Sequence, residues 1–190
     1  MIFSFISRIV DGVKGGVAAS LRGAADISSS VVNVVKEITV STLKESSEFV
    51  KAGLDVPASI VKGALTGVGE IGASVIGAVR GVVSGTVQGL MGSDVDQETA
   101  VRGSVAQAIH SAKELGVNVG DTAVEAVKGS VEAVGQVGGD TVNATKTAVV
   151  AAYEAAKDIG GETLGTVKSS LSSGIEGAEK IIEAIKGEEE

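Results

Sequence analysis

The sequence contains no cysteine, no tryptophan and a single histidine in 190 residues. The absence of cysteine excludes disulfides, thiolate metal ligands and cysteine nucleophiles, and one histidine leaves little for transition-metal binding. There are also only one tyrosine, three phenylalanines and two methionines. Because large side chains that fill a globular core are scarce, apolar burial has to be spread over a long surface of small side chains.

Positive charge is also in short supply, since 16 Lys and Arg residues oppose 24 Asp and Glu residues, for a formal charge of −8. Nucleic-acid binding needs a basic footprint that displaces counterions, so no nucleic-acid partner is expected. No nucleophile or acid–base pair stands out, so we expect no enzyme, no cofactor and no metal site. The stretch from Gly67 to Gly72 matches a dinucleotide-binding fingerprint in letters, but it follows a helical pattern rather than a strand.

What the sequence has instead is an eleven-residue apolar repeat, which keeps its phase from Val10 to Ile175. Eleven residues make three helical turns at about 3.67 residues per turn, so the repeat places one apolar stripe along a helix. Ile2 and Ile6 fall in the same frame upstream. We expect a lipid or a partner to face the stripe residues, which are Ile2, Ile6, Val10, Leu21, Val32, Leu43, Leu54, Leu65, Ile76, Val87, Ile109, Val131, Val142, Tyr153, Leu164 and Ile175.

The two edges of this stripe differ in chemistry. On one edge small residues recur, and four glycines at every fourth position predict a close contact with another helix: Gly77, Gly81, Gly85 and Gly89. On the other edge basic residues recur, which suits side chains that reach the polar rim of a lipid surface and equally suits the solvated flank of a helix bundle. This basic rim consists of Lys14, Lys36, Arg80, Arg102, Lys113, Lys146, Lys157 and Lys168.

The pattern predicts an all-α protein of very long amphipathic helices, folded as an extended hairpin. The turn is placed near 92–98, where Gly92 can end a helix and Asp94 with Gln97 resembles a capping box. A bend is expected near Pro57, because proline lacks the backbone N–H. The predicted divisions are an apolar N-terminal segment 1–9, a first repeat half 10–91, the turn 92–98, a second repeat half 99–186 and an acidic tail 187–190.

Three phrases carry a family resemblance: residues 63–68 (GALTGV), 78–89 (AVRGVVSGTVQG) and 145–150 (TKTAVV). They resemble the 11-residue repeats of perilipins and synucleins, which are similarly rich in Val, Thr, Gly and Lys and poor in aromatic residues. The resemblance covers nearly the whole chain as a pattern. It implies a long helix that lies on a lipid droplet or on a curved membrane.

Function depends on what receives the stripe, because each interior glycine costs a helix about 0.5–1 kcal/mol relative to alanine and isolated helices of this kind are marginal. One hypothesis is a peripheral lipid-binding coat or membrane-remodelling and scaffolding protein, cytoplasmic and peripheral to a membrane or lipid droplet. The alternative is a self-assembling structural protein, a right-handed coiled-coil oligomer or filament in which the stripes pack on each other. The expected partners are therefore a lipid surface and further copies of the chain.

Overall fold

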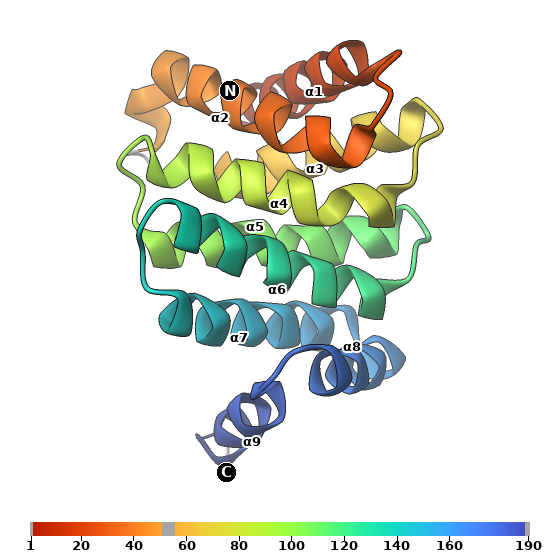
Figure 1. Cartoon of the computed structure of the whole chain (residues 1–190), viewed down its shortest axis with the longest axis vertical. Coiled ribbons are helices and arrows are strands. Elements are labelled where there is room, and N and C mark those ends of the chain that lie inside the picture. Colours follow the sequence, from red (N-terminus) through yellow and green to blue (C-terminus); the bar gives the residue numbers. More distant parts are fainter. Residues whose placement is uncertain (1, 51–55, 189–190) are drawn as a thin grey trace.

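The chain forms short helices that lie across its long axis, one above the next (Figure 1). The structure, a computed structural model, describes residues 2–50 and 56–188, and this part contains helices and turns but no strand. The prediction of an all-α protein is confirmed. The helices of the described part are α1 (Ile2–Leu21), α2 (Ile27–Val50), α3 (Val56–Glu70), α4 (Val75–Met91), α5 (Gln97–Glu114), α6 (Val119–Gln136), α7 (Thr141–Ile159), α8 (Gly161–Gly174) and α9 (Ala178–Glu188).

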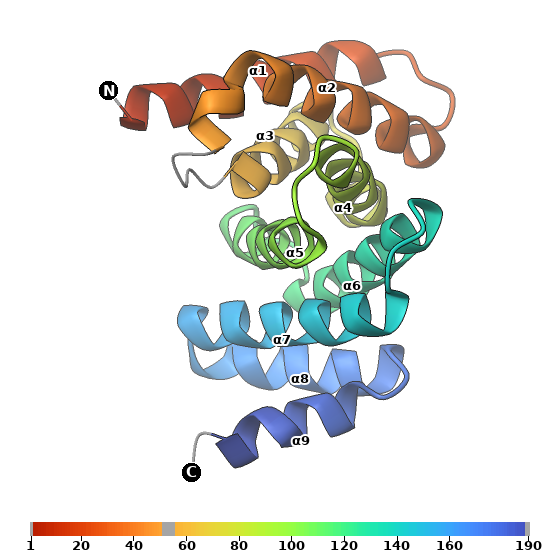
Figure 2. The same cartoon turned by 90° about the vertical axis from the view of Figure 1, so that its left-hand side faces the viewer.

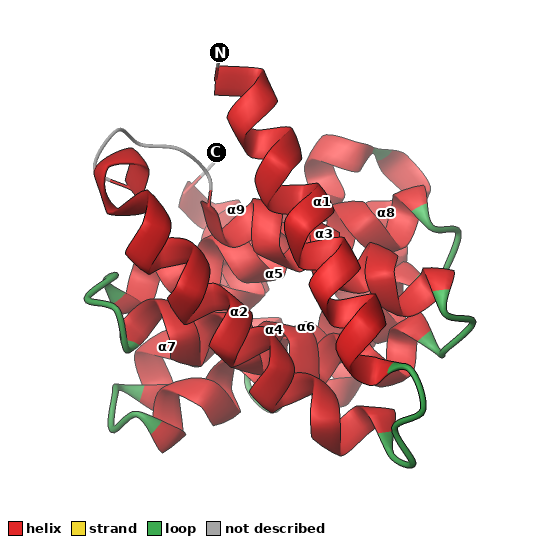
Figure 3. Ribbon diagram, turned by 90° about the horizontal axis from the view of Figure 1, so that it is seen from above, coloured by secondary structure: helices red, strands yellow, loops and turns green. Residues whose placement is uncertain are grey.

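Each helix packs on the helix two places further along the chain. The contacts run α1 to α3, α3 to α5, α5 to α7 and α7 to α9 in one layer, and α2 to α4, α4 to α6 and α6 to α8 in the other. Consecutive helices also touch, which joins the two layers. Figure 2 shows the resulting stack, with α1 and α2 at one end and α9 at the other, and Figure 3 views it from above. This arrangement is a helical solenoid, in which neighbours bury each other's apolar faces.

The turns that follow α3 to α7 recur with a 22-residue spacing, and the first four of them share one backbone geometry. A residue with positive φ follows each helix from α3 to α7, and it is glycine at every position except Asp94 (φ 65°). In the first four of these turns, the next residue donates its N–H to a carbonyl five positions earlier, at 2.8–3.2 Å, which is the Schellman geometry. The positive-φ residues are Gly72, Asp94, Gly116, Gly138 and Gly160.

Helix starts recur with the same 22-residue spacing. Ser74, Asp96, Asn118 and Asp140 each precede a helix, and each side chain accepts a backbone N–H from three positions further on, at 2.8–3.1 Å. Such N-caps satisfy donors that the first helical turn leaves open. Together with the Schellman turns, these caps end one helix and start the next within a short connection.

The expected long hairpin is wrong, because the chain also turns at Gly72, Gly116 and Gly138 and not only near 92–98. A 22-residue unit is two repeats, or six turns at about 3.67 residues per turn, so a turn that completes the unit leaves the phase of the stripe unchanged. Near 92–98 a turn does occur, but Asp94 holds the positive-φ position and Asp96 is the cap.

The bend expected near Pro57 takes a different form. Pro57 lies in the first turn of α3, where a proline is tolerated because the N–H it lacks would have no partner within the helix. Residues 51–55 before it lie outside the described residues.

The apolar helix α4 has only 17 residues and carries Arg80. None of the helices in residues 2–50 and 56–188 combines the length and the apolar content that a membrane crossing needs.

Candidate functional site

The stripe predicted from the sequence lies mostly between the helices. Six of its residues are buried, seven are half-buried, and Val142, in the first turn of α7, is 80% exposed. Leu54 and the side chain of Ile2 lie outside the described part. The buried members are Leu21, Leu43, Leu65, Val87, Ile109 and Tyr153, and the half-buried members are Ile6, Val10, Val32, Ile76, Val131, Leu164 and Ile175.

Glycines on α3 and α4 bring helix backbones into direct contact. A Cβ atom at Gly63 or Gly67 would lie 2.6 Å from a carbonyl oxygen of α1, and one at Gly85 would lie 2.5 Å from the carbonyl oxygen of Val32 in α2. Gly81 and Gly89 likewise face α2, while Gly77 touches only Ser74, the cap of its own helix. Three of the four glycines expected at a close helix contact therefore lie at the α2–α4 contact.

Basic residues of the rim form a ladder of ion pairs between helices two places apart. Lys14 of α1 lies 3.3 Å from Glu70, Arg80 of α4 lies 3.0 Å from Glu132, and Arg102 of α5 lies 2.8 Å from Glu154. Lys62 of α3, outside the predicted rim, makes the same kind of pair with Glu114 at 3.1 Å. These side chains are 31–55% exposed, so each pair contributes at most about 1 kcal/mol. Their repetition suits the solvated flank of a helix stack.

The remaining rim residues differ in their exposure. Lys36, Lys113, Lys146 and Lys157 are exposed, and Lys168 is half-buried. Hydrogen bonding and charge repulsion from Lys186 of α9 are the largest causes that lower the pKa of Lys168. Glu179 of α9 acts in the opposite direction and raises the pKa of Lys168, so charges of both signs lie where α8 meets α9.

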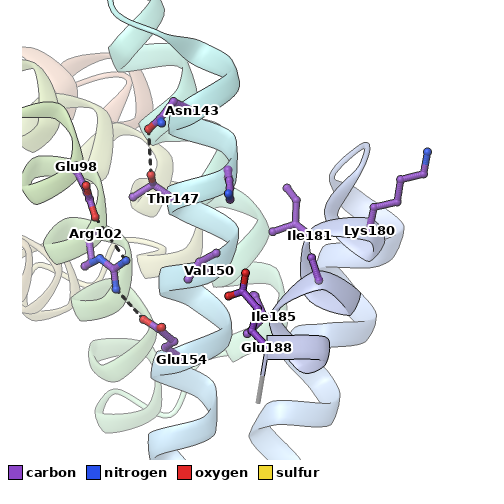
Figure 4. Close-up of a pocket in the computed structure, with 12 residues that line it drawn as sticks. Glu98, Arg102, Asn143, Thr147, Val150, Glu154, Lys180, Ile181, Ile185 and Glu188 are labelled. Atoms are coloured by element: carbon purple, nitrogen blue, oxygen red, sulfur yellow. Dashed lines mark hydrogen bonds and ion pairs between the residues drawn. The ribbon is translucent and has the colours of Figure 1, made fainter. Parts of the chain in front are cut away.

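A groove of about 580 Å³ lies where α9 packs on α7, with α5 at its side (Figure 4). Its apolar wall is formed by Val150 of α7 and by Ile181 and Ile185 of α9, all half-buried. Figure 4 shows both isoleucines turned toward α7 and Lys180 pointing away from the groove. The groove is large enough for a small ligand. Eight of its twelve lining residues are polar or charged, so its apolar surface is confined to the wall formed by α7 and α9.

Only some polar groups of the groove have partners among the described residues. Arg102 forms ion pairs with two acids of the groove, Glu154 at 2.8 Å and Glu98 at 3.7 Å. The Thr147 hydroxyl lies 3.3 Å from the Asn143 side-chain oxygen, to which it donates. Lys146 also lines the groove and has no ion pair within 4.0 Å among the described residues. Sequence reasoning placed Lys146 on the rim but missed the groove, since its walls come from three helices far apart in sequence.

The described part of the chain also lacks the ligand pattern of a metal site. Among residues 2–50 and 56–188, no three His, Cys, Asp or Glu side chains gather as metal ligands do. His110 is half-buried on α5. No protein-family model matches the chain, and no curated protein matches it in sequence.

Proposed function

We propose that this chain is a non-enzymatic scaffold built of 22-residue helical units, which presents binding surfaces on a folded stack. The observation that carries the proposal is the burial of the apolar stripe between helices of the same chain. The stripe then needs no outside receiver to be stable. Solenoids of this kind work as surfaces for other molecules, because each unit repeats the same outward face.

A lipid coat, in which the stripe lies on a membrane or droplet, requires the helices to separate. Separation exposes core side chains to water, which costs about 25 cal/mol for each Å² of apolar surface. It also breaks the glycine contacts of α3 and α4. Peripheral lipid association through the stripe is therefore a property of an opened state. It is the other outcome of the test below.

Self-assembly into an oligomer or filament remains the second alternative. It predicts a large helical assembly in the absence of lipid, which the oligomeric state of the purified chain tests.

Lipid-free folding tests the scaffold against the coat. We expect the purified chain to be strongly helical, to melt cooperatively and to gain no helicity with small, neutral phosphatidylcholine vesicles, as measured by circular dichroism and flotation. Light scattering after size exclusion reads the oligomeric state in the same samples. A chain that becomes helical only with vesicles and floats with them overturns the scaffold in favour of the coat.

Two matched substitutions in the stripe sharpen this test. Val87→Lys places a charge in the core, whereas Val142→Lys changes a side chain that is 80% exposed in the stack. The scaffold predicts that Val87→Lys unfolds the chain and Val142→Lys leaves its melting temperature nearly unchanged. A coat predicts that both weaken vesicle binding to a similar degree, since both positions belong to one lipid-facing stripe.

A further inference from the structure

We propose that the groove between α7 and α9 binds an amphiphile with one anionic head group and an aliphatic body, of the kind represented by a medium-chain carboxylate or alkyl phosphate. The inference rests on the proposed function only in requiring that the helices be folded without a lipid surface. It assigns a ligand class to one end of the stack.

The walls of the groove select the aliphatic body. Val150, Ile181 and Ile185 are half-buried, so they already exclude part of the water and leave apolar surface that a ligand covers. Val150 lies seven positions after Asn143 on α7, or about 10 Å along a helix at about 1.5 Å per residue. An aliphatic ligand of about that length spans the groove from Asn143 to the isoleucines. The cavity volume of about 580 Å³ admits it.

The ladder of ion pairs selects the sign of the head group. Lys146 lies two 22-residue units after Arg102 and three after Arg80, so it occupies the same place in its unit. Arg80 and Arg102 each meet a glutamate on the helix two places along. For Lys146 that helix is α9, which places no carboxylate within 4.0 Å of the ammonium in the part that the structure describes. An anionic head group on Lys146 supplies the missing partner.

Asn143 is placed to assist the head group. Its side-chain oxygen accepts the Thr147 hydroxyl, which leaves its amide N–H groups to donate to an anion. Both Asn143 and Lys146 line the groove from α7, one turn apart. Figure 4 shows Asn143 at one end of the groove and Glu188 at the other, so a carboxylate or phosphate at the Asn143 end is far from that acid.

Three acids line the groove, and the two on α5 and α7 do not favour a cationic ligand. Glu98 and Glu154 are both engaged by Arg102, so a cation would have to compete with a guanidinium for them. Glu188, the third acid, lies at the end of the groove away from Asn143 (Figure 4). Lys146, by contrast, has no carboxylate within 4.0 Å of its ammonium among the described residues. The charge that remains to be satisfied at the polar end of the groove is positive.

Calorimetric titration with decanoate, kept below its micelle concentration, tests the proposal on the full chain. We expect one molecule bound per chain, and decanol of the same chain length to bind about tenfold more weakly because it lacks the charge. Lys146→Gln weakens decanoate binding about tenfold, for the same reason, and leaves decanol binding unchanged. Lys36→Gln, at the same place in an earlier unit and outside the groove, changes neither.

Filling the groove provides a second and independent variant. Ala184 is exposed on the α9 wall, so Ala184→Phe blocks the cavity without burying a charge, and decanoate binding is lost while the melting temperature is kept. No binding of decanoate by the folded wild type overturns the inference, as does binding that neither Lys146→Gln nor Ala184→Phe affects. Either result leaves the lipid-free folding of the scaffold intact, so the two proposals fail separately.

Vesicles distinguish the source of the ligand. Phosphatidylcholine vesicles that contain a fifth of phosphatidic acid present the same anionic head group and aliphatic body within a membrane. Flotation that Ala184→Phe abolishes assigns the groove to a lipid in a bilayer, and binding of decanoate without flotation assigns it to a free amphiphile. Both results support the inference. Flotation that persists in Ala184→Phe, without decanoate binding, contradicts it.

Discussion

Glycines of α4 and glycines of α1 lie in equally regular helices but in opposite surroundings. Gly81, Gly85 and Gly89 face α2 so closely that a Cβ atom at any of them would clash with its backbone or side chains. Gly12 and Gly15 of α1 have nothing within 4 Å of the place where a Cβ would stand. The same residue therefore permits close packing in one helix and only adds backbone freedom in the other.

This contrast explains how a chain with 27 glycines holds a stable helix stack. A glycine in a helix costs about 0.5–1 kcal/mol relative to alanine wherever it stands. At α3 and α4 the cost is offset because the helix axes approach until backbone atoms touch, which extends the dispersion contacts of small side chains. At the outer face of α1 no such contact offsets it.

Among the glycine substitutions, the largest effect is expected from Gly85→Ala. The new methyl group would stand 2.5 Å from the carbonyl oxygen of Val32 and 3.1 Å from the backbone nitrogen of Lys36, so α2 and α4 must move apart. Overpacking of this kind costs about 1–3 kcal/mol, and backbone atoms yield less readily than side-chain ends, so the upper half of that range is expected. Urea unfolding measures the loss. A change within about 0.5 kcal/mol, as for an ordinary surface substitution, would remove close packing as the reason for the glycines of α4.

Much of this fold was predictable, but not the length of its helices. The apolar period identified the helical class, and the regular spacing of glycines pointed to the face that packs on α2. The period cannot distinguish one continuous helix from 22-residue units, since both preserve the stripe. A second signal in the sequence distinguishes these two structures. A capping residue stands two positions after each of the first three of four glycines that recur every 22 or 44 residues: Gly72, Gly116, Gly138 and Gly160.

Turn glycines form a third class, tested by Gly116→Ala. Gly116 has φ of 69° and open space around it, so alanine meets no clash and its only cost is the left-handed backbone. That conformation costs an L-residue about 1–2 kcal/mol. The converse substitution, Asp94→Gly at the same turn position, is expected to stabilise the chain by up to about 1 kcal/mol. Equal melting temperatures for Gly116→Ala and the wild type would contradict this assignment.

The stabilisation by the N-cap Asp96 depends on pH, which distinguishes it from the effect of turn geometry. Hydrogen bonds from the Thr99 backbone N–H, at 2.8 Å, and from the Thr99 hydroxyl, at 2.7 Å, lower the pKa of Asp96. Because the pKa is lowered in the folded state, the ionised cap stabilises the chain at pH values above the pKa of an unfolded aspartate, about 3.9. This stabilisation is lost as the pH falls through the pKa of Asp96 in the folded chain.

Asp96→Ala is therefore expected to cost about 1 kcal/mol at pH 7 and less at pH 3, as measured by urea unfolding at both values. Asp96→Asn keeps the accepting oxygen without the charge, so its difference from Asp96→Ala stays the same at both pH values. A penalty for Asp96→Ala that does not shrink at pH 3 would show that the charge of the cap contributes nothing.

The groove at α7 and α9 was beyond prediction from sequence because no single helix contains it. Lys146 was recognisable as a rim residue, but its lack of an ion pair among the described residues depends on how the short helix α9 sits on α7. Periodicity reports the face of a residue on its own helix. It does not report which helix stands opposite, and that information decides whether a basic residue is paired, as Arg102 is, or left open.

The smallest effect, with the opposite sign, is expected from Gly12→Ala. Gly12 is exposed in the interior of α1 and its missing Cβ faces open space, so alanine adds helix propensity without a contact to disturb. The chain gains about 0.5–1 kcal/mol, which for 190 residues raises the melting temperature by about 1–4 °C. Gly15→Ala, also open, should add a similar increment. A destabilising result at both positions would mean that the outer face of α1 is covered in solution, since only a neighbour on that face makes a methyl group costly there.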